Sequence, residues 1–115
     1  MTNKEIIRKV NEGFMKGDVN AIIEHVADDV TWELPGVFFR RGKEEFGKEA
    51  INENWMPLVI THLNEIEEGN LVAVEGTVET SKPTGEPFNL YFFDFYRMEN
   101  GKIKEMRSYV IPKNN

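Results

Sequence analysis

The sequence predicts an α+β fold, with helices toward the amino terminus and an antiparallel sheet after them. Two patterns with apolar residues every third or fourth position come first, and period-two alternation dominates from residue 58 onward. Helices that precede a run of strands joined by short turns are typical of helices packed on one side of an antiparallel sheet. A length of 115 residues suits one domain, so we expect a single domain over residues 1–115.

Two short helices are expected first. Thr2 and Glu5 have the spacing of a capping box, apolar residues then recur every fourth position, and Gly17 marks the end of the helix. Asp18 is placed to cap a second helix over residues 19–29. The two aspartates that end this second pattern are interpreted as a solvated turn.

A strand and a third helix follow. Residues 30–34 alternate apolar and polar side chains until Pro35 and Gly36 end the strand. The polar stretch 42–57 carries a few apolar side chains on one side, Trp55 among them. It predicts a helix with a weak apolar face that ends before the proline at position 57.

Four more strands are expected in the second half, joined by turns rich in glycine, asparagine and proline. They cover residues 58–66, 71–80, 88–98 and 103–111. The third of them is apolar on both faces, which an antiparallel sheet with one wet face does not require. We therefore expect a homodimer in which a second copy covers the outer row, through Tyr91, Phe93 and Phe95.

Composition argues against several classes of partner and site. With 14 lysines and arginines against 20 aspartates and glutamates, the net charge is -6, so we expect no nucleic-acid partner. The chain has no cysteine, and His25 and His62 stand in no ligand-spaced cluster, so we expect surface histidines, no metal and no cofactor. Because no apolar run reaches the roughly 20 residues of a membrane span or resembles a signal peptide, we expect a cytoplasmic protein without membrane contact.

One charged residue, Asp94, interrupts an apolar row of the 88–98 strand. A carboxylate among apolar side chains is costly unless it is paired, hydrogen-bonded or neutralised. Asp94 is therefore either an acid, base or hydrogen-bond donor at the bottom of an apolar pocket, or the partner of Arg107 in a salt bridge. A two-residue Asn-Gly turn sets Asp94 opposite Arg107, whereas a three-residue turn sets it opposite Met106. The residues alone leave both pairings open.

Both tryptophans also have two interpretations. Trp32 and Leu34 lie on one face of the first strand, where the indole either stacks on a flat ligand or packs in the core. Trp55 in the third predicted helix either closes over a cavity or is part of the core.

The order and content of these segments resemble a known superfamily. The stretches KGDVNAIIEHVADDVTWELPG, RGKEEF, LVAVEGTVE, FDFYRMENGKI and RSYV are similar to the nuclear transport factor 2-like superfamily, in particular its ketosteroid isomerase and SnoaL-like polyketide cyclase branch. The resemblance covers nearly the whole chain. It implies a cone, in which a curved antiparallel sheet wraps the amino-terminal helices around a deep apolar pocket, and dimerisation through the outer face of the sheet.

The resemblance also implies which residues form the pocket. It turns Asp94 inward, where Asp94 matches the aspartate that ketosteroid isomerases hold neutral as a donor to the substrate oxyanion, and it turns Arg107 outward. The implied ligand-binding residues are Phe14, Trp32, Leu34, Trp55, Val74, Phe92, Tyr96, Met106 and Ser108.

Two related activities lack their full residue sets. Leu34 stands where ketosteroid isomerases place their base, and Val10 where they place an oxyanion tyrosine. The arginine and two aspartates of limonene epoxide hydrolases are also missing. The remaining hypotheses are a cofactor-free isomerase or cyclase with Asp94 as its acid and base, a protein that binds an apolar molecule without catalysis, and a dimeric interaction module.

Overall fold

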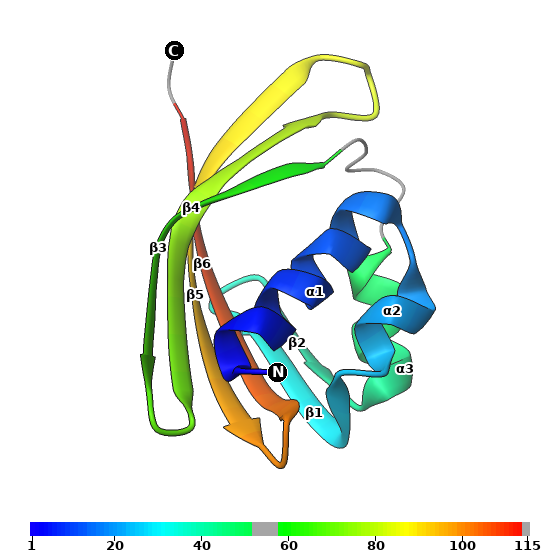
Figure 1. The fold of residues 1–115 in the computed structure, drawn as a ribbon. Coiled ribbons are helices and arrows are strands. Elements are labelled where there is room, and N and C mark those ends of the chain that lie inside the picture. Colours follow the sequence, from blue (N-terminus) through cyan, green and yellow to red (C-terminus); the bar gives the residue numbers. More distant parts are fainter. Residues whose placement is uncertain (52–57, 114–115) are drawn as a thin grey trace.

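The computed structural model describes residues 1–51 and 58–113, in which a curved sheet wraps around helices on its concave side (Figure 1). The elements in chain order are α1 (Asn3–Lys16), α2 (Val19–Ile23), β1 (Val26–Leu34), β2 (Phe38–Arg41), α3 (Lys43–Ala50), β3 (Val59–Glu68), β4 (Leu71–Ser81), β5 (Pro87–Glu99) and β6 (Lys102–Pro112). The strand order is β2-β1-β6-β5-β4-β3, with β1 and β6 parallel and the other neighbours antiparallel. The predicted α+β class is confirmed.

The first two helices begin where the sequence predicts. Thr2 Oγ1 accepts a hydrogen bond from the Glu5 N–H at 3.1 Å, and the Glu5 carboxylate accepts one from the Thr2 N–H at 2.9 Å, which completes the capping box. Gly17 ends α1 in the left-handed conformation, with φ 66°. Asp18 caps α2 by accepting from the Ala21 N–H at 3.2 Å.

The prediction that the second helix continues to residue 29 was wrong. α2 ends at Ile23, and Val26 begins β1. Val26 pairs with Ile103 of β6, and both side chains are fully buried. This pairing with a strand far away in the sequence overrides the helical spacing of the apolar residues. The two aspartates at positions 28 and 29 therefore lie in a strand, although both are solvent-exposed, as expected.

The next two elements also differ from expectation. After Leu34 a turn, closed by a 2.8 Å hydrogen bond from the Val37 N–H to the Leu34 carbonyl, returns the chain along β1 as β2. The sequence predicted no strand there because FFRR is too short to show alternation. α3 ends at Ala50, since Ile51 has φ -106° and ψ 67°. The last part of the predicted third helix, residues 52–57 with Trp55, lies outside the described residues.

The β5–β6 hairpin decides where Asp94 points. Its two-residue turn has Asn100 and Gly101 at φ 52° and 75°, which the primed turns of tight hairpins require. An irregularity after Arg97 then shifts the pairing by one residue, so that Asp94 lies opposite Ser108. Both pairings considered from the sequence assumed an unbroken ladder, and both were wrong. The bulge nevertheless leaves Asp94 on the inner face, as the resemblance implied.

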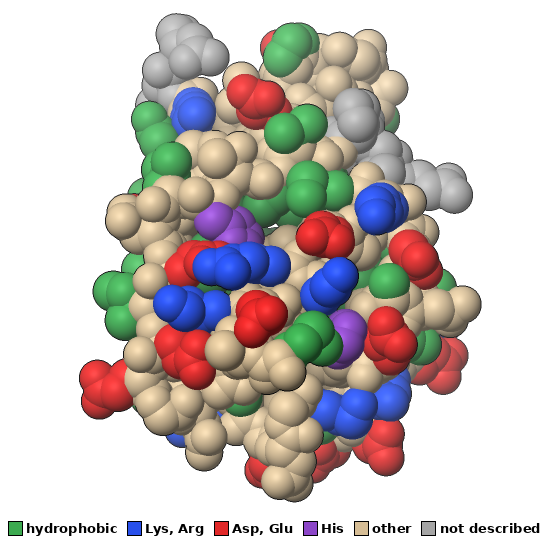
Figure 2. Space-filling model, viewed as in Figure 1, with side chains coloured by type: hydrophobic (Ala, Val, Ile, Leu, Met, Phe, Trp, Pro, Cys, Tyr) green, Lys and Arg blue, Asp and Glu red, His purple; other side chains and the backbone are tan. Residues whose placement is uncertain are grey.

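The core lies between the helices and the concave side of the sheet. Its fully buried or nearly fully buried residues are Ile7, Val10, Ile22, Val26, Val30, Phe46, Val72, Val74, Tyr96 and Ile103. On the face that carries α1, acidic and basic side chains are mixed rather than gathered by sign (Figure 2). None of the helices described is long and apolar enough to cross a membrane.

Candidate functional site

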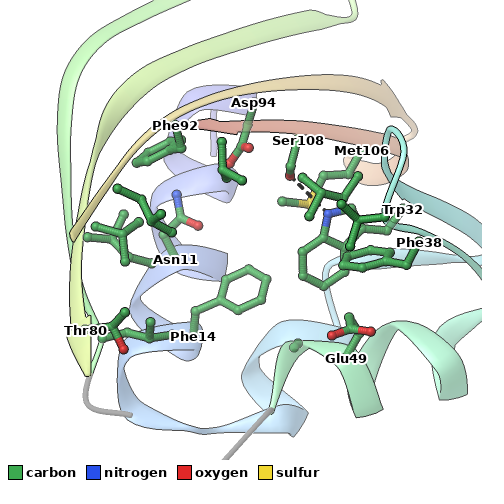
Figure 3. Close-up of a pocket in the computed structure, with 18 of the residues that line it drawn as sticks. Asn11, Phe14, Trp32, Phe38, Glu49, Thr80, Phe92, Asp94, Met106 and Ser108 are labelled. Carbon is green, nitrogen blue, oxygen red and sulfur yellow. Dashed lines mark hydrogen bonds between the residues drawn. The ribbon is translucent and has the colours of Figure 1, made fainter. Parts of the chain in front are cut away.

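A cavity of about 450 Å³ lies between the concave side of the sheet, α1 and α3. Its wall is mostly apolar, and Figure 3 shows side chains from both the sheet and the helices pointing into one space. Seven residues predicted for the site line it: Phe14, Trp32, Leu34, Phe92, Asp94, Met106 and Ser108. The other predicted residues do not line it, because Val74 and Tyr96 are fully buried in the core and Trp55 is outside the described residues.

Asp94 lies at the sheet side of this cavity and is only 7% exposed. The Tyr96 hydroxyl donates to Asp94 Oδ2 at 3.1 Å, and Ser108 on the facing strand is a second hydrogen-bond partner. Arg107 turns to the other face of the sheet, where it pairs with Glu105 at 2.8 Å and Glu33 at 3.6 Å. The salt bridge between Asp94 and Arg107 that the sequence left open is therefore not formed.

The surroundings of Asp94 favour its neutral form. Burial raises the pKa of Asp94 from 3.8 to about 6, while the hydrogen bonds from Ser108 and Tyr96 act in the opposite direction. A carboxyl with this pKa exchanges a proton near neutral pH, so it can act as an acid and as a base in one reaction cycle.

Trp32 connects the polar and apolar parts of the wall. Its indole N–H donates to Ser108 Oγ at 3.0 Å, which holds the oxygen that faces Asp94 (Figure 3). Its ring makes edge contacts with Phe14 at 5.7 Å and Phe38 at 5.2 Å between ring centroids. The two interpretations of Trp32 therefore do not exclude each other, since the ring both packs against its neighbours and lines the cavity.

Sequence reasoning missed three polar residues of the cavity. Asn11 lies in the buried stripe of α1, four residues after Ile7, and an amide at that spacing was the signal that could have revealed it. Thr80 is nearly fully buried, and its hydroxyl has no hydrogen-bond partner among the described residues. Glu49 of α3 also lines the cavity, where it pairs with Arg40 at 2.9 Å.

Both histidines reach the surface but are largely covered by their neighbours. The side chains of His25 and His62 are only 17% and 16% exposed. His62 lies within hydrogen-bonding distance of Asn11 and Glu65, whereas His25 lies 3.5 Å from Glu24. Among the residues described, no group of three or more histidine, aspartate or glutamate side chains is arranged to hold a metal ion.

Comparison with solved structures supports the architecture. A protein of unknown function with the nuclear transport factor 2-like fold from Burkholderia pseudomallei is 22% identical with a TM-score of 0.84, over 94% of this chain and 90% of that one. A similar protein of unknown function from Cytophaga hutchinsonii is 25% identical with a TM-score of 0.73, over 96% and 100% of the two chains. The epoxide hydrolase/cyclase-like enzyme SalBIII, which takes part in pyran ring formation in the polyether salinomycin, is 24% identical with a TM-score of 0.81, over 95% and 90%.

Sequence comparison identifies the family. No curated protein matched the chain. The model of the SnoaL-like domain matches residues 7–106, a range that includes most of α1, the whole of β1 with Trp32, Asp94 on β5 and the first five residues of β6. These residues cover most of the sequence, and the matching structures share the same curved sheet. This chain belongs to the SnoaL-like domain family, with the nuclear transport factor 2-like fold.

Proposed function

We propose that this chain is a cofactor-independent enzyme that transfers a proton on a small, flat, largely apolar carbonyl compound, with Asp94 as base and acid. One observation carries the proposal: Asp94 is a buried carboxyl beside an apolar cavity, and it has no cationic partner among the described residues. Desolvation brings its pKa to about 6, within the range that proton transfer near neutral pH requires.

The proposed reaction begins with the Asp94 carboxylate removing a proton from the carbon beside the substrate carbonyl. The electron pair of the broken C–H bond moves to the carbonyl oxygen, which becomes an enolate. Protonated Asp94 accepts hydrogen bonds less strongly, so the Ser108 hydroxyl, whose oxygen is held by the Trp32 N–H, turns its proton to the enolate oxygen. Where a carbon–carbon double bond of the substrate is conjugated with the enolate, Asp94 returns its proton to the far carbon of that double bond, and the double bond shifts toward the carbonyl, which completes an isomerisation. In a cyclisation the enolate carbon attacks a second carbonyl of the same molecule, and Asp94 protonates the resulting alkoxide.

The cavity limits the class of ligand. Its volume of about 450 Å³ lies within the range of small-molecule sites, and its mostly apolar wall favours a molecule with few polar groups. The hydroxyl of Thr80, which has no hydrogen-bond partner within residues 1–51 and 58–113, lies across the cavity from Ser108 (Figure 3). A ligand with a second oxygen at its far end would satisfy Thr80, so we expect a substrate with polar groups at both ends rather than a pure hydrocarbon ketone.

The proposal predicts solvent proton exchange catalysed by Asp94. In D₂O, the wild-type protein is expected to exchange the protons beside the carbonyl in at least one member of a panel of fused-ring ketones and 1,3-diketones, followed by proton NMR. Asp94→Asn removes the group that holds the proton, so the rate should fall by about 100-fold or more. Asp28→Asn is the matched control, because Asp28 is a fully solvated carboxyl on β1. Equal rates in Asp94→Asn and wild type, or no exchange with any member of the panel, would contradict the proposal.

A binding protein without catalysis is the second candidate. Leu34 presents an apolar side chain to the cavity, and the other lining carboxylate, Glu49, is already paired with Arg40. Asp94 would therefore work without a second catalytic carboxylate. Saturable binding of these ketones without proton exchange would favour this function, with Asp94 and Thr80 as hydrogen-bond partners of the ligand.

The convex face of the sheet supports the proposal of a homodimer. Tyr91, Phe93, Tyr109 and Ile111 are 46–65% exposed there and form two adjacent cross-strand pairs. Of the three residues predicted for this interface, Phe95 is the least exposed, since the guanidinium groups of Arg97 and Arg107 lie 5.9 and 5.8 Å from its ring centre. Acidic and basic side chains both flank this apolar patch, which suits a self-complementary contact with a second copy.

The dimer is tested by its mass in solution. Light scattering at micromolar concentration is expected to give twice the mass of one chain, and Phe93→Lys is expected to give the mass of one chain. Phe39→Lys is the control, because Phe39 on β2 is exposed to a similar extent, 49% against 46% for Phe93. A monomeric wild type, or a dimer that Phe93→Lys leaves intact, would count against this interface.

A further inference from the structure

A line of hydrogen bonds leads from Asp94 away from the cavity. Tyr96, which is fully buried, donates to Asp94 Oδ2 at 3.1 Å. Burial raises the pKa of Tyr96 well above its usual value, Asp94 adds to this rise, and a hydrogen bond with Asn11 acts in the opposite direction. Figure 3 shows the nitrogen of Asn11 turned toward the sheet and its oxygen turned toward the cavity, so the group of Asn11 on the side of Tyr96 is the amino group, which only donates. We therefore take Asn11 to donate to Tyr96, and Tyr96 donates to Asp94.

The same amino group also fixes the proton of His62. Asn11 Nδ2 lies 2.6 Å from His62 Nε2. A side-chain amino group only donates, so His62 Nε2 must be the unprotonated, accepting nitrogen. The ring proton of the neutral imidazole is then on Nδ1, which lies 2.7 Å from Glu65 Oε2 and donates to it. With the Asn11 amide in this orientation, the tautomer of His62 that fits both contacts carries its proton on Nδ1.

Glu65, the hydrogen-bond acceptor of His62, is held by an ion pair with Arg8. Arg8 Nε lies 3.1 and 3.0 Å from the two oxygens of Glu65. The hydrogen bond from Arg8 lowers the pKa of Glu65 to about 2, burial opposes it, and the bond from His62 lowers it further. Glu65 is therefore an anion at neutral pH and a permanent acceptor for His62 Nδ1. The groups that face His62 are Asn11 and the Arg8–Glu65 pair on its polar edges, and the ring of Phe92 at 6.2 Å.

We infer that His62 is a positioning residue for Asp94. By accepting from Asn11, His62 holds the amino group of Asn11, rather than its oxygen, against Tyr96, so that the Tyr96 hydroxyl has Asp94 as its acceptor. With the amide reversed, the Asn11 oxygen would accept from Tyr96, and Asp94 would lose that donor. An amide does not pass protons along, so this line orients Asp94 and does not conduct protons to it.

The orientation of Asn11 adds a hydrogen-bond acceptor to the cavity, and its role in catalysis rests on the proposed function. With its amino group turned toward His62 and Tyr96, Asn11 keeps its oxygen on the cavity side (Figure 3). That oxygen accepts hydrogen bonds, whereas neutral Asp94 and Ser108 donate. We therefore expect the ligand to carry an O–H or N–H donor near its carbonyl, as in enolised 1,3-diketones and β-hydroxyketones.

The first test reads the tautomer of His62 in the unmodified protein. Nitrogen-15 NMR with two-bond couplings to the ring protons is expected to show a protonated Nδ1 and a bare Nε2 in His62 at pH 7.5. The matched control is His25, whose ring contacts Glu24 and is hydrogen-bonded to no side-chain amide in the described part of the chain. The signal that disappears in His25→Gln is assigned to His25. A proton on Nε2 of His62 would overturn the inference, because Nε2 would then not accept from Asn11.

The second test follows Asp94 itself. Carbon-13 NMR of its carboxyl group is expected to give a titration midpoint about half a pH unit or more higher in His62→Phe, which keeps a ring but has no acceptor. His62→Gln, whose amide oxygen can accept from Asn11, should return the midpoint most of the way toward wild type, and His25→Gln should not move it. Midpoints that agree in all four proteins would overturn the inference.

This readout separates the inference from the proposed function. If the midpoint moves in His62→Phe but no ketone exchanges protons, the positioning role stands and the enzymatic function fails. If exchange depends on Asp94 but the midpoint does not respond to His62, the inference alone is wrong. Should His62→Phe fail to fold, the tautomer in the wild-type protein still decides, because a proton on Nε2 of His62 overturns the inference.

Discussion

The wild-type protein is expected to lose about 3 kcal/mol of unfolding free energy between pH 3 and pH 7 relative to Asp94→Asn. The pKa of Asp94 is raised by burial from 3.8 to about 6 in the folded state. Between these two values the folded protein binds more protons than the unfolded chain, so its stability falls as pH rises. Each unit of pKa shift corresponds to about 1.4 kcal/mol, which gives the expected size. The neutral side chain of Asp94→Asn removes this dependence.

Urea denaturation at a series of pH values measures this effect. The unfolding free energy is plotted against pH, and the slopes of this plot for wild type and Asp94→Asn are compared. Asparagine at position 94 replaces a hydrogen-bond acceptor with an amino group, which shifts the whole curve by an amount that does not depend on pH. Asp28→Asn serves as the control, since Asp28 is exposed. If the wild type and Asp94→Asn follow parallel curves from pH 3 to pH 7, Asp94 is not a desolvated carboxyl.

Gly76→Ala is expected to destabilise the fold by about 3 kcal/mol or more. A Cβ added at Gly76 would lie 2.1 Å from the backbone oxygen of Thr61 and 2.7 Å from the ring of Phe92. The close contact with β3 lies next to the register shift between His62 and Asn64. Because a backbone oxygen cannot turn aside as a side chain does, β3 would have to move away from β4. The structure attributes the close approach of these strands to the missing side chain at position 76.

Thermal and urea unfolding of Gly76→Ala measure this loss. Gly47→Ala in α3 is the matched control, since its nearest neighbour would be a methyl group of Val19 at 3.0 Å, which belongs to a side chain. In addition, alanine favours a helix over glycine by about 1 kcal/mol. Gly47→Ala should therefore change stability little. Typical surface substitutions change the unfolding free energy by about 0.5 kcal/mol or less. If Gly76→Ala lowers it by no more than about twice that amount, the role given to Gly76 is contradicted.

Local signals in the sequence predicted the helices best at their beginnings. The Thr2–Glu5 capping box and the Asp18 cap depend on residues within one turn, so their spacing alone was sufficient. The end of the second helix depends on Ile103, which pairs with Val26 across the sheet, and no local pattern reveals such a partner. The strand β2 was missed for the same reason, because its four residues are defined by their pairing with β1.

The candidate site shows the same limit more sharply. The apolar row around Asp94 made that residue a candidate from the sequence alone, but its pairing depended on a bulge that leaves no clear residue signature. The resemblance to the superfamily correctly placed Asp94 inward and Arg107 outward. It did not reveal Asn11, Thr80 or His62, whose roles depend on which side chains from distant elements meet them.

The central claim is that Asp94 is a desolvated carboxyl that carries a proton near neutral pH. The most direct measurement is a pH titration of the Asp94 side-chain carboxyl carbon by NMR, with Asp94→Asn used to assign the signal. The structure predicts a midpoint of about 6, because burial outweighs the hydrogen bonds from Ser108 and Tyr96. A midpoint at or below about 3.9, the value of a free aspartate, would show a solvated or charge-paired carboxylate and would contradict the proposed function.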